Sequence, residues 1–243
     1  MTPAANLALR VAQRVGDKLV QQLDRNFQKS DAPLTDEALR SLTDFGVAFA
    51  TEELNQAHPD DLVTVELDKN HQPGADRAWL ISFSGAENLR RGFAEFSILV
   101  SRFEAGSVTG MALYSPLRQE EFTAAKGKGC SFNGRRVRGS GVTTIENASL
   151  SGTEDLGLGG AHIATGDTLR DLALAATARI DLAVALDLPA EYRTALNLMF
   201  TEAGHLTGDR NGAPISARHT DLVAAPPKAF KLLIPALKQH LEA

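Results

Sequence analysis

The sequence contains very little cysteine, since Cys130 is the only one among its 243 residues. A single cysteine excludes an intrachain disulfide, and one free thiol is typical of a reducing compartment. We therefore expect a cytoplasmic protein. A small buried apolar residue is the favoured interpretation of Cys130 and a nucleophile is the alternative, so we expect it to react slowly with thiol reagents.

Long apolar runs and an excess of basic residues are lacking as well. No stretch reaches the length of a membrane span, and no charged start followed by an apolar run is present, so we expect neither a membrane association nor a secretory signal. The formal net charge is −5, with a pI of about 5.7. Nucleic-acid-binding proteins usually carry a concentrated basic surface. We therefore expect no nucleic-acid partner, while a protein partner is not excluded.

Apolar residues make up 43% of the chain and charged residues 23%, which is typical of a folded globular protein. That content is enough for a large buried core. The chain shows no repeat, low-complexity tract or linker. We therefore expect one domain over residues 1–243, with an α+β half at 1–145 and an α/β half at 146–243.

The N-terminal region predicts two amphipathic helices. Residues 4–28 place apolar side chains at helical spacing between basic ones. Thr35 can cap a second helix, which ends before Pro59.

The pattern then changes to period two and predicts a long antiparallel meander. Tight turns are expected at the EAG and PLRQ sequences and at later glycines. The expected strands are 63–65, 79–81, 96–103, 107–115, 120–125 and a continuation through 127–138.

Helical patterns return in the C-terminal part, after a glycine-dense segment at 151–166 that predicts no clear element. We expect helices at 168–181, 191–204 and 228–242, a buried strand at 182–186 and a turn at 205–212. Pro235 stands where it can kink the last helix. This mixed order argues for layered sheets with helices packed outside and between them.

One run carries a specific family resemblance. The sequence YSPLRQEEFTAAKGKGCSFNGRRVRGS, starting at Tyr114, resembles the strand–turn–strand signature of the inositol monophosphatase family, although Ser115 replaces the aspartate of the signature's Asp-Pro pair. The matching residues are Glu121, Phe122, Ala124, Gly127, Gly129, Asn133, Gly134 and Val137.

Other segments are similar to the same family in the same order along nearly the whole chain. They are the 166–181 helix, the Glu-Ala-Gly at 202–204 and the final strand and helix from Asp221. The resemblance implies a layered αβαβα sandwich of α+β and α/β character, commonly a homodimer. The segment 151–165 is shorter than the family norm.

The resemblance also implies where a metal site would lie. Family enzymes cleave phosphate monoesters with Mg²⁺, which carboxylates hold. These carboxylates come from a Glu-Glu pair after a strand, a D-P-x-D-G-T motif and a W-D-x-A-A motif. In the first place Glu66 matches the first glutamate, but Leu67 replaces the second.

The second motif is degenerate at the sequence SFSGAEN. Gly85 matches the family glycine, and Ala86 replaces the threonine after it. The two aspartates fall on Ser82 and Ser84 if the preceding tryptophan is held fixed, or on Ile81 and Ser84 if the glycine is. Neither alignment restores a carboxylate.

The third motif is replaced by Glu191 and Tyr192, with the glutamate one residue off register. Thr43 stands where the family often has an aspartate that orients water. We expect no intact catalytic residue, no bound metal and no cofactor. The resemblance thus implies a vestigial site at Glu66, Ser82, Ser84, Gly85, Ala86, Glu191 and Tyr192.

Ordinary structural roles compete with each of these assignments. Glu66 can be a solvated residue at a strand end, and Ser82 and Ser84 can be turn residues that bond nearby amides. The run 135–138 (RRVR) is interpreted as a solvated strand face rather than an anion contact. An anion contact at Glu87, Arg90 and Arg91 has weak support. The histidines show no metal-binding spacing, and we expect surface positions for His58, His71, His162, His205, His219 and His240.

Three functions remain open from the sequence. The first is an inactive pseudophosphatase with a binding or regulatory role, whose surface binds a partner protein or another copy of itself. The second is an active Mg²⁺-dependent phosphatase of inositol, sugar or nucleotide monoesters, with Glu66 and either Glu191 or Asp187 as unexpected ligands. The third is a metal-free sensor that binds phosphate or sulfate weakly at the amides around Gly85.

Overall fold

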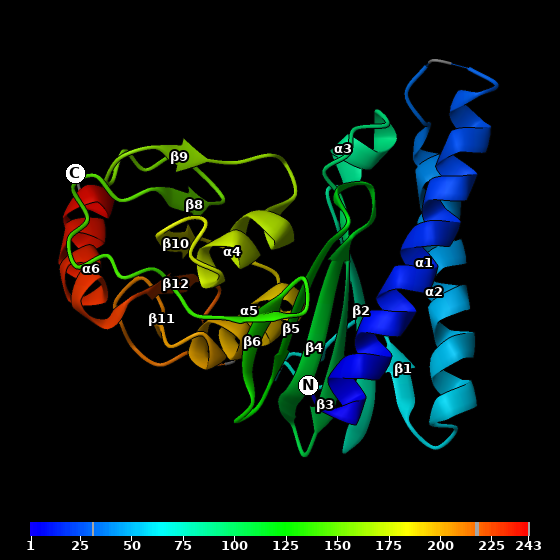
Figure 1. Cartoon of the computed structure of the whole chain (residues 1–243), viewed down its shortest axis with the longest axis horizontal. Helices are drawn as coiled ribbons and strands as arrows, with labels where there is room; N and C mark the ends of the chain where they lie inside the picture. Colours follow the sequence, from blue (N-terminus) through cyan, green and yellow to red (C-terminus); the bar gives the residue numbers. More distant parts are fainter. Residues whose placement is uncertain (31, 217–218, 243) are drawn as a thin grey trace.

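The computed structural model describes residues 1–30, 32–216 and 219–242. The chain forms five layers, in which a helix pair, a seven-stranded sheet, a second helix pair, a five-stranded sheet and a last helix follow one another (Figure 1). This is the αβαβα arrangement that the family resemblance predicts. The helices of the layers are α1 (Pro3–Phe27), α2 (Asp36–Ala57), α4 (Thr168–Ala176), α5 (Ala190–Glu202) and α6 (Pro227–Leu241).

The two outer N-terminal helices begin where the sequence predicts. The hydroxyl of Thr35 accepts a hydrogen bond from an amide of the first turn of α2, at 3.2 Å, and Thr2 caps α1 in the same way. Gly16 lets α1 lie close against the seven-stranded sheet, because a Cβ there would stand 2.6 Å from Pro116 and 3.0 Å from Tyr114. The helix pair is therefore fixed to one face of the sheet (Figure 1).

The seven-stranded sheet, sheet A, is the predicted meander. Each strand lies beside the next one in sequence, and every pair is antiparallel except β1 with β2. Ala105 and Gly106 both have positive φ and close the first hairpin, as the EAG sequence predicts. The strands are β1 (Leu62–Thr64), β2 (Arg77–Ser84), β3 (Ser97–Glu104), β4 (Ser107–Ser115), β5 (Glu120–Ala125), β6 (Gly129–Phe132) and β7 (Arg135–Val137).

Two short helices interrupt this sheet's connections. Helix α3 (Ala86–Arg90) follows β2, and the 3₁₀ helix η1 (Pro116–Arg118) joins β4 to β5.

The five-stranded sheet, sheet B, has the order β11-β12-β10-β8-β9, with β10 parallel to β8 and antiparallel to β12. Three of its strands differ from the sequence-based expectation, because each has only two or three residues and therefore shows no period. Helix α6 runs through Pro235 as one element. The strands are β8 (Leu150–Gly152), β9 (His162–Ile163), β10 (Leu182–Ala185), β11 (Leu206–Gly208) and β12 (Leu222–Ala225).

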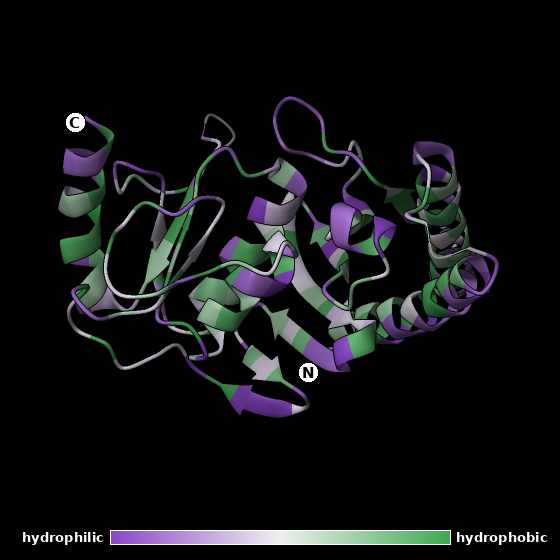
Figure 2. Cartoon of the chain, turned by 90° about the horizontal axis from the view of Figure 1, so that it is seen from above, coloured by the Kyte–Doolittle hydropathy of each residue, from purple (hydrophilic) through white to green (hydrophobic). Residues whose placement is uncertain are grey.

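Alternate residues of each strand face opposite sides of the sheet, so one strand contributes to two hydrophobic clusters. On β2, Leu80 faces the cluster under α4 and α5, whereas Trp79 and Ile81 face the cluster under α1 and α2. Figure 2 shows hydrophobic and hydrophilic residues alternating along the helices, as expected for helices that pack one side against a sheet. None of the helices in the described part of the chain is long and apolar enough to cross a membrane.

Cys130 is fully buried in the cluster under α4 and α5, which confirms the predicted apolar role. Burial, with a smaller contribution from Glu202, raises the pKa of its thiol to about 12. Its slow reaction with thiol reagents stays a prediction.

The predicted surface position of His205 is wrong, because its side chain is buried. Gly204, with a φ of 90°, ends α5 and turns the following residue inward. The ring packs edge-on against Phe200, with centroids 5.3 Å apart, and lies over Gly139, where a Cβ would overlap it. Burial lowers the pKa of His205 to about 4.

Candidate functional site

Four elements meet around an open hollow of about 460 Å³, here named the β2 hollow. Helix α2, the end of β1, the middle of β2 and the start of α5 each contribute to its wall. Most of the predicted site residues gather here. The described lining residues are Thr43, Asp44, Val47, Val65, Glu66, Ile81, Ser82, Phe83, Pro189, Glu191 and Tyr192.

Glu66 lies exposed just past the end of β1, with its backbone amide and carbonyl both bonded to the Thr64 hydroxyl at 3.2 and 3.0 Å. Leu67 turns the other way and packs against the core under α4 and α5. The second position of the glutamate pair therefore serves the core, and Glu66 is the one carboxylate that this pair presents to the β2 hollow.

Glu191 and Tyr192 occupy the start of α5. Glu191 is engaged with the backbone of the loop after β1, and Tyr192 with the backbone of β2. The Glu191 carboxylate accepts a hydrogen bond from the Leu67 amide at 3.2 Å. The Tyr192 hydroxyl donates to the Phe83 carbonyl, and burial raises the pKa of this phenol to about 12. The place of an aspartate in the family motif is thus taken by a neutral hydrogen-bond donor.

Ser82 and Ser84 lie on the same face of β2 but in different surroundings. The Ser82 hydroxyl lines the hollow and has no hydrogen-bond partner among the described residues. The Ser84 hydroxyl is buried behind it and accepts from the Leu169 amide at 3.2 Å. Neither hydroxyl carries the negative charge that a divalent ion requires.

Gly85 and Ala86 lie beyond the described lining of the β2 hollow, at the start of α3. Gly85 has a φ of 82°, and a Cβ there would stand 2.8 Å from the Cα of Phe96, so only glycine fits. Asp187 also lies apart, exposed, where its carboxylate accepts from the Thr220 hydroxyl at 2.9 Å.

The charged residues after Gly85, considered above as an anion contact, already form ion pairs. Arg90 lies 2.5 Å from Asp36 and 3.1 Å from Glu87, and Arg91 lies 2.7 Å from Glu87. These surface pairs leave little net positive charge for an anion.

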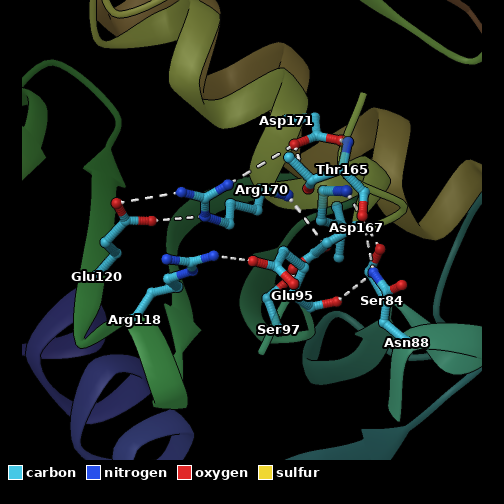
Figure 3. A network of polar contacts seen from close by, with 11 residues as sticks. Ser84, Asn88, Glu95, Ser97, Arg118, Glu120, Thr165, Asp167, Arg170 and Asp171 are labelled. Atoms are coloured by element: carbon cyan, nitrogen blue, oxygen red, sulfur yellow. Dashed lines mark hydrogen bonds and ion pairs between the residues drawn. The ribbon is translucent and has the colours of Figure 1, made fainter. Parts of the chain in front are cut away.

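Sequence reasoning missed Asp167, which lies beside Ser84 and is fully buried (Figure 3). It caps α4, where its carboxylate accepts from the Ser97 hydroxyl at 2.9 Å and the Arg170 amide at 3.2 Å. Burial raises its pKa to about 6, although hydrogen bonds from Ser84, Arg170 and Ser97 lower it. The available signal was an aspartate directly before a helical pattern, but that signal marks a cap and does not reveal burial.

Ion pairs surround Asp167 without reaching it (Figure 3). Arg170 lies 2.6 Å from Glu120 and 3.8 Å from Asp171, and Arg118 pairs with Glu95. This network joins α4 to sheet A next to the degenerate motif.

The chemistry of the donors decides whether the β2 hollow fits Mg²⁺. The ion prefers near-octahedral oxygen ligands with carboxylates among them. The carboxylates here are Glu66, Glu191 and the exposed Asp44 of α2, which the sequence analysis did not single out. Within residues 1–30, 32–216 and 219–242, no group of three or more His, Cys, Asp or Glu is arranged to hold a metal ion. As they stand, these side chains do not fit Mg²⁺.

Full-length relatives exist in several bacteria. No family model matches the chain. A protein of Pseudomonas aeruginosa named Nus factor SuhB is 28% identical over 270 residues, which cover 99% of this chain and 98% of the relative. The protein of the same name in Haemophilus influenzae is 25% identical over 280 residues, covering 100% of this chain and 98% of the relative.

Solved structures share the fold along the same length. The extragenic suppressor protein suhB of Bartonella henselae superposes with a TM-score of 0.82 at 20% identity, covering 98% of this chain and 100% of that one. An inositol monophosphatase from Anabaena gives a TM-score of 0.79 at 17% identity, covering 97% and 94%. With this fold, the full-length relatives and the strand–turn–strand signature, the chain belongs to the inositol monophosphatase/SuhB family.

Proposed function

We propose that this protein is a catalytically inactive pseudophosphatase that keeps the family fold for a binding or regulatory role. The observation that carries the proposal is the donor set of the β2 hollow. Tyr192 donates to a backbone carbonyl, Glu191 is engaged with the Leu67 amide, and Ser82 is uncharged.

Electrostatics explains why these departures matter together. A phosphate dianion and an attacking water need divalent ions that polarise the one and deprotonate the other. Several carboxylates must stand close together to cancel the repulsion among such ions. Removing one transition-state contact costs roughly a hundredfold to a thousandfold in rate. Groups that act as a unit lose their function together, although the losses do not multiply.

The names of the relatives support a binding role. Full-length relatives carry the name Nus factor, while solved structures of the same fold carry the name inositol monophosphatase. One fold therefore occurs under both a factor name and a phosphatase name. We place this chain with the factors, in a reducing cellular compartment as its single buried thiol suggests.

An active phosphatase with a rearranged site is the second candidate. The observation in its favour is the β2 hollow itself, because about 460 Å³ is enough for a sugar phosphate and three carboxylates lie on its wall. Under this alternative Glu66, which is exposed and just past β1, is the first ligand.

Purified protein with inositol monophosphate, fructose bisphosphate and adenosine bisphosphate at several millimolar Mg²⁺ separates the two candidates. We expect no turnover and no saturable Mg²⁺ binding by calorimetry. Turnover near one per second or faster, within the ordinary enzyme range of roughly 1–10³ s⁻¹, that is abolished by Glu66→Gln would overturn the pseudophosphatase. Glu121→Gln, outside the hollow, is the matched control for the loss of one carboxylate.

The family resemblance also supports a homodimer. Light scattering at micromolar concentration is expected to give twice the 26.0 kDa chain mass. A mass of one chain across the micromolar range would contradict it.

A further inference from the structure

A second cavity, here named the α5 cavity, has about 470 Å³ and shares no described lining residue with the β2 hollow. The turn at 70–72, the β3–β4 hairpin and one face of α5 form most of its wall. Its volume lies within the usual range of small-molecule sites, roughly 300–1,000 Å³. The cavity is therefore large enough for a ligand of its own.

Arg193 of α5 lines this cavity and is only 1% exposed. One terminal nitrogen donates to the Leu188 carbonyl at 2.7 Å, and the other lies 3.1 Å from Nδ1 of His71. The Nε atom has no hydrogen-bond partner among the described residues. A guanidinium has five N–H donors, so most of its capacity is unused.

The buried positive charge of Arg193 has no anionic partner in direct contact among the described residues. A charge taken out of water is destabilising unless it is paired, and no carboxylate of the described residues lies within 4.0 Å of the Arg193 guanidinium. Burial lowers the pKa of Arg193, while the more distant Asp221 and Glu191 raise it. The described residues of the protein therefore supply no carboxylate in direct contact with this guanidinium.

His71 covers one side of the guanidinium. It lies half-buried on the 70–72 turn with a φ of 58°, and Asp68 holds the turn by accepting from the amides of Asn70 and Gln72 at 2.8 and 2.9 Å. Burial, and then Arg193, lower the pKa of His71. A neutral imidazole is a weak acceptor for a cation, so a carboxylate that replaces it gains a charge-assisted pair.

The charges and apolar side chains of the rest of the cavity wall indicate which class of ligand fits. Lys126 adds a positive charge at the rim, and the Glu202 carboxylate is held by the amides of Gly127 and Gly129 at 2.6 and 2.7 Å. With Arg193 these charges leave the cavity one net positive charge, which matches a monoanion. The apolar part of the wall consists of Phe103, Val108, Leu198 and Ile215.

We propose that the α5 cavity binds a small organic carboxylate, whose carboxylate pairs with Arg193 and whose apolar body packs on Phe103 and Val108. Binding is independent of any hydrolysis in the β2 hollow. It makes this protein a receptor for a small monoanion.

The test is calorimetry or ligand-observed NMR with benzoate, phenylacetate and hexanoate, with benzamide as the neutral isostere. We expect at least one carboxylate to bind saturably with a dissociation constant below about 10 mM. The dissociation constant of benzamide is expected to be at least tenfold higher, which corresponds to about 1.4 kcal/mol. Arg193→Met, which keeps the volume and removes the charge, is expected to abolish carboxylate binding. His71→Ala, which uncovers the guanidinium, is expected to tighten it.

A second variant tests binding independently, in case Arg193→Met fails to fold. Thr201 is exposed at the rim, so Thr201→Trp fills the mouth without touching the guanidinium and is expected to block binding with an unchanged melting temperature. Glu66→Gln in the β2 hollow is the control that leaves binding unchanged. No saturable carboxylate binding, equal binding of benzamide, or binding that survives both cavity variants would overturn the proposal. Inorganic phosphate that displaces the carboxylates and binds more tightly would overturn the carboxylate class.

Discussion

Two buried aspartates at different places along sheet A behave in opposite ways. Asp61, just before β1, is 7% exposed, and Asp167, at the start of α4, is 0% exposed. Burial raises the pKa of Asp61, but hydrogen bonds from Arg102 and Trp79 outweigh it and leave that pKa below its ordinary value. Burial of Asp167 raises its pKa to about 6.

The difference lies in the neighbours. Asp61 contacts Arg102 and lies 3.3 Å from Arg77, and the Arg102 guanidinium stacks over Trp79 at 4.9 Å. Asp167 has hydroxyls and an amide around it, and no described cation lies within ion-pair distance of its carboxylate. Charge is balanced around Asp61. It is unbalanced beside Ser84, where the sequence departs from the family's metal motif.

Removal of Asp61 is expected to have the largest effect. Asp61→Ala leaves the buried Arg102 with the exposed Glu104, at 3.4 Å, as its remaining ion-pair partner among the described residues. Breaking a buried pair in this way costs about 3–5 kcal/mol. Denaturant unfolding measures the loss. Asp60→Ala, the exposed neighbour, is the matched control and is expected to stay within about 0.5 kcal/mol of wild type. Equal effects of the two variants would mean that the pair around Asp61 is not structural.

The pH dependence of stability sharpens the comparison at Asp167. Its folded pKa of about 6 lies above the ordinary 3.8, so the folded state holds this proton more tightly. Protonation of Asp167 therefore contributes roughly 3 kcal/mol to the free energy of unfolding. This contribution is complete below pH 3.8 and is lost as the pH rises through about 6. Asp167→Asn is expected to remove that loss and to exceed wild type in stability at pH 7. A variant less stable than wild type at pH 7 would show that the charged form is favoured.

A carboxylate whose hydrogen bonds, among the described residues, come from two backbone amides is an intermediate case between Asp61 and Asp167. Glu202 is held by the amides of Gly127 and Gly129, and hydrogen bonds to a charged group contribute about 1.5–3 kcal/mol. Glu202→Gln keeps the shape and removes the charge, so we expect a loss of about 1–2 kcal/mol. Glu202→Ala is expected to cost more. If both variants unfold at the wild-type denaturant midpoint, amide contacts do not replace a cation here.

The smallest effect is expected for an exposed pair. Arg14 and Glu53 join α1 to α2, but the arginine side chain is 52% exposed. A double-mutant cycle with Arg14→Ala and Glu53→Ala is expected to give a coupling energy of at most about 1 kcal/mol, decreasing with added salt. Coupling above about 2 kcal/mol would place this pair with the buried ones.

Sequence patterns predicted the long elements and much of the β2 hollow. Regular periodicity marks helices α1 and α2 and the strands β3 to β5, and the family motifs point to Glu66, Ser82, Glu191 and Tyr192, which do meet in space. Motif spacing carried this information because each motif sits at the end of a strand or the start of a helix.

The remaining features depend on tertiary contacts that no local pattern reports. The strands β8, β9 and β11 are too short to show a period. The burial of Asp167 and His205 comes from elements distant in sequence, and so does the incomplete hydrogen bonding of Arg193. A sequence shows that such residues can ionise, but only the packing shows which partner each one lacks.

The strand order also determines how long each strand waits for its pairing partner during synthesis. Sheet A is made from consecutive strands that end at Val137, so each strand from β2 onward follows a neighbour that has already been synthesised. In sheet B, β10 must wait for β12, which begins at Leu222. At roughly 5–20 residues per second this interval lasts a few seconds, during which an apolar strand has one bare edge. Translation that stops between residues 186 and 221 would leave that edge free to pair with other nascent chains.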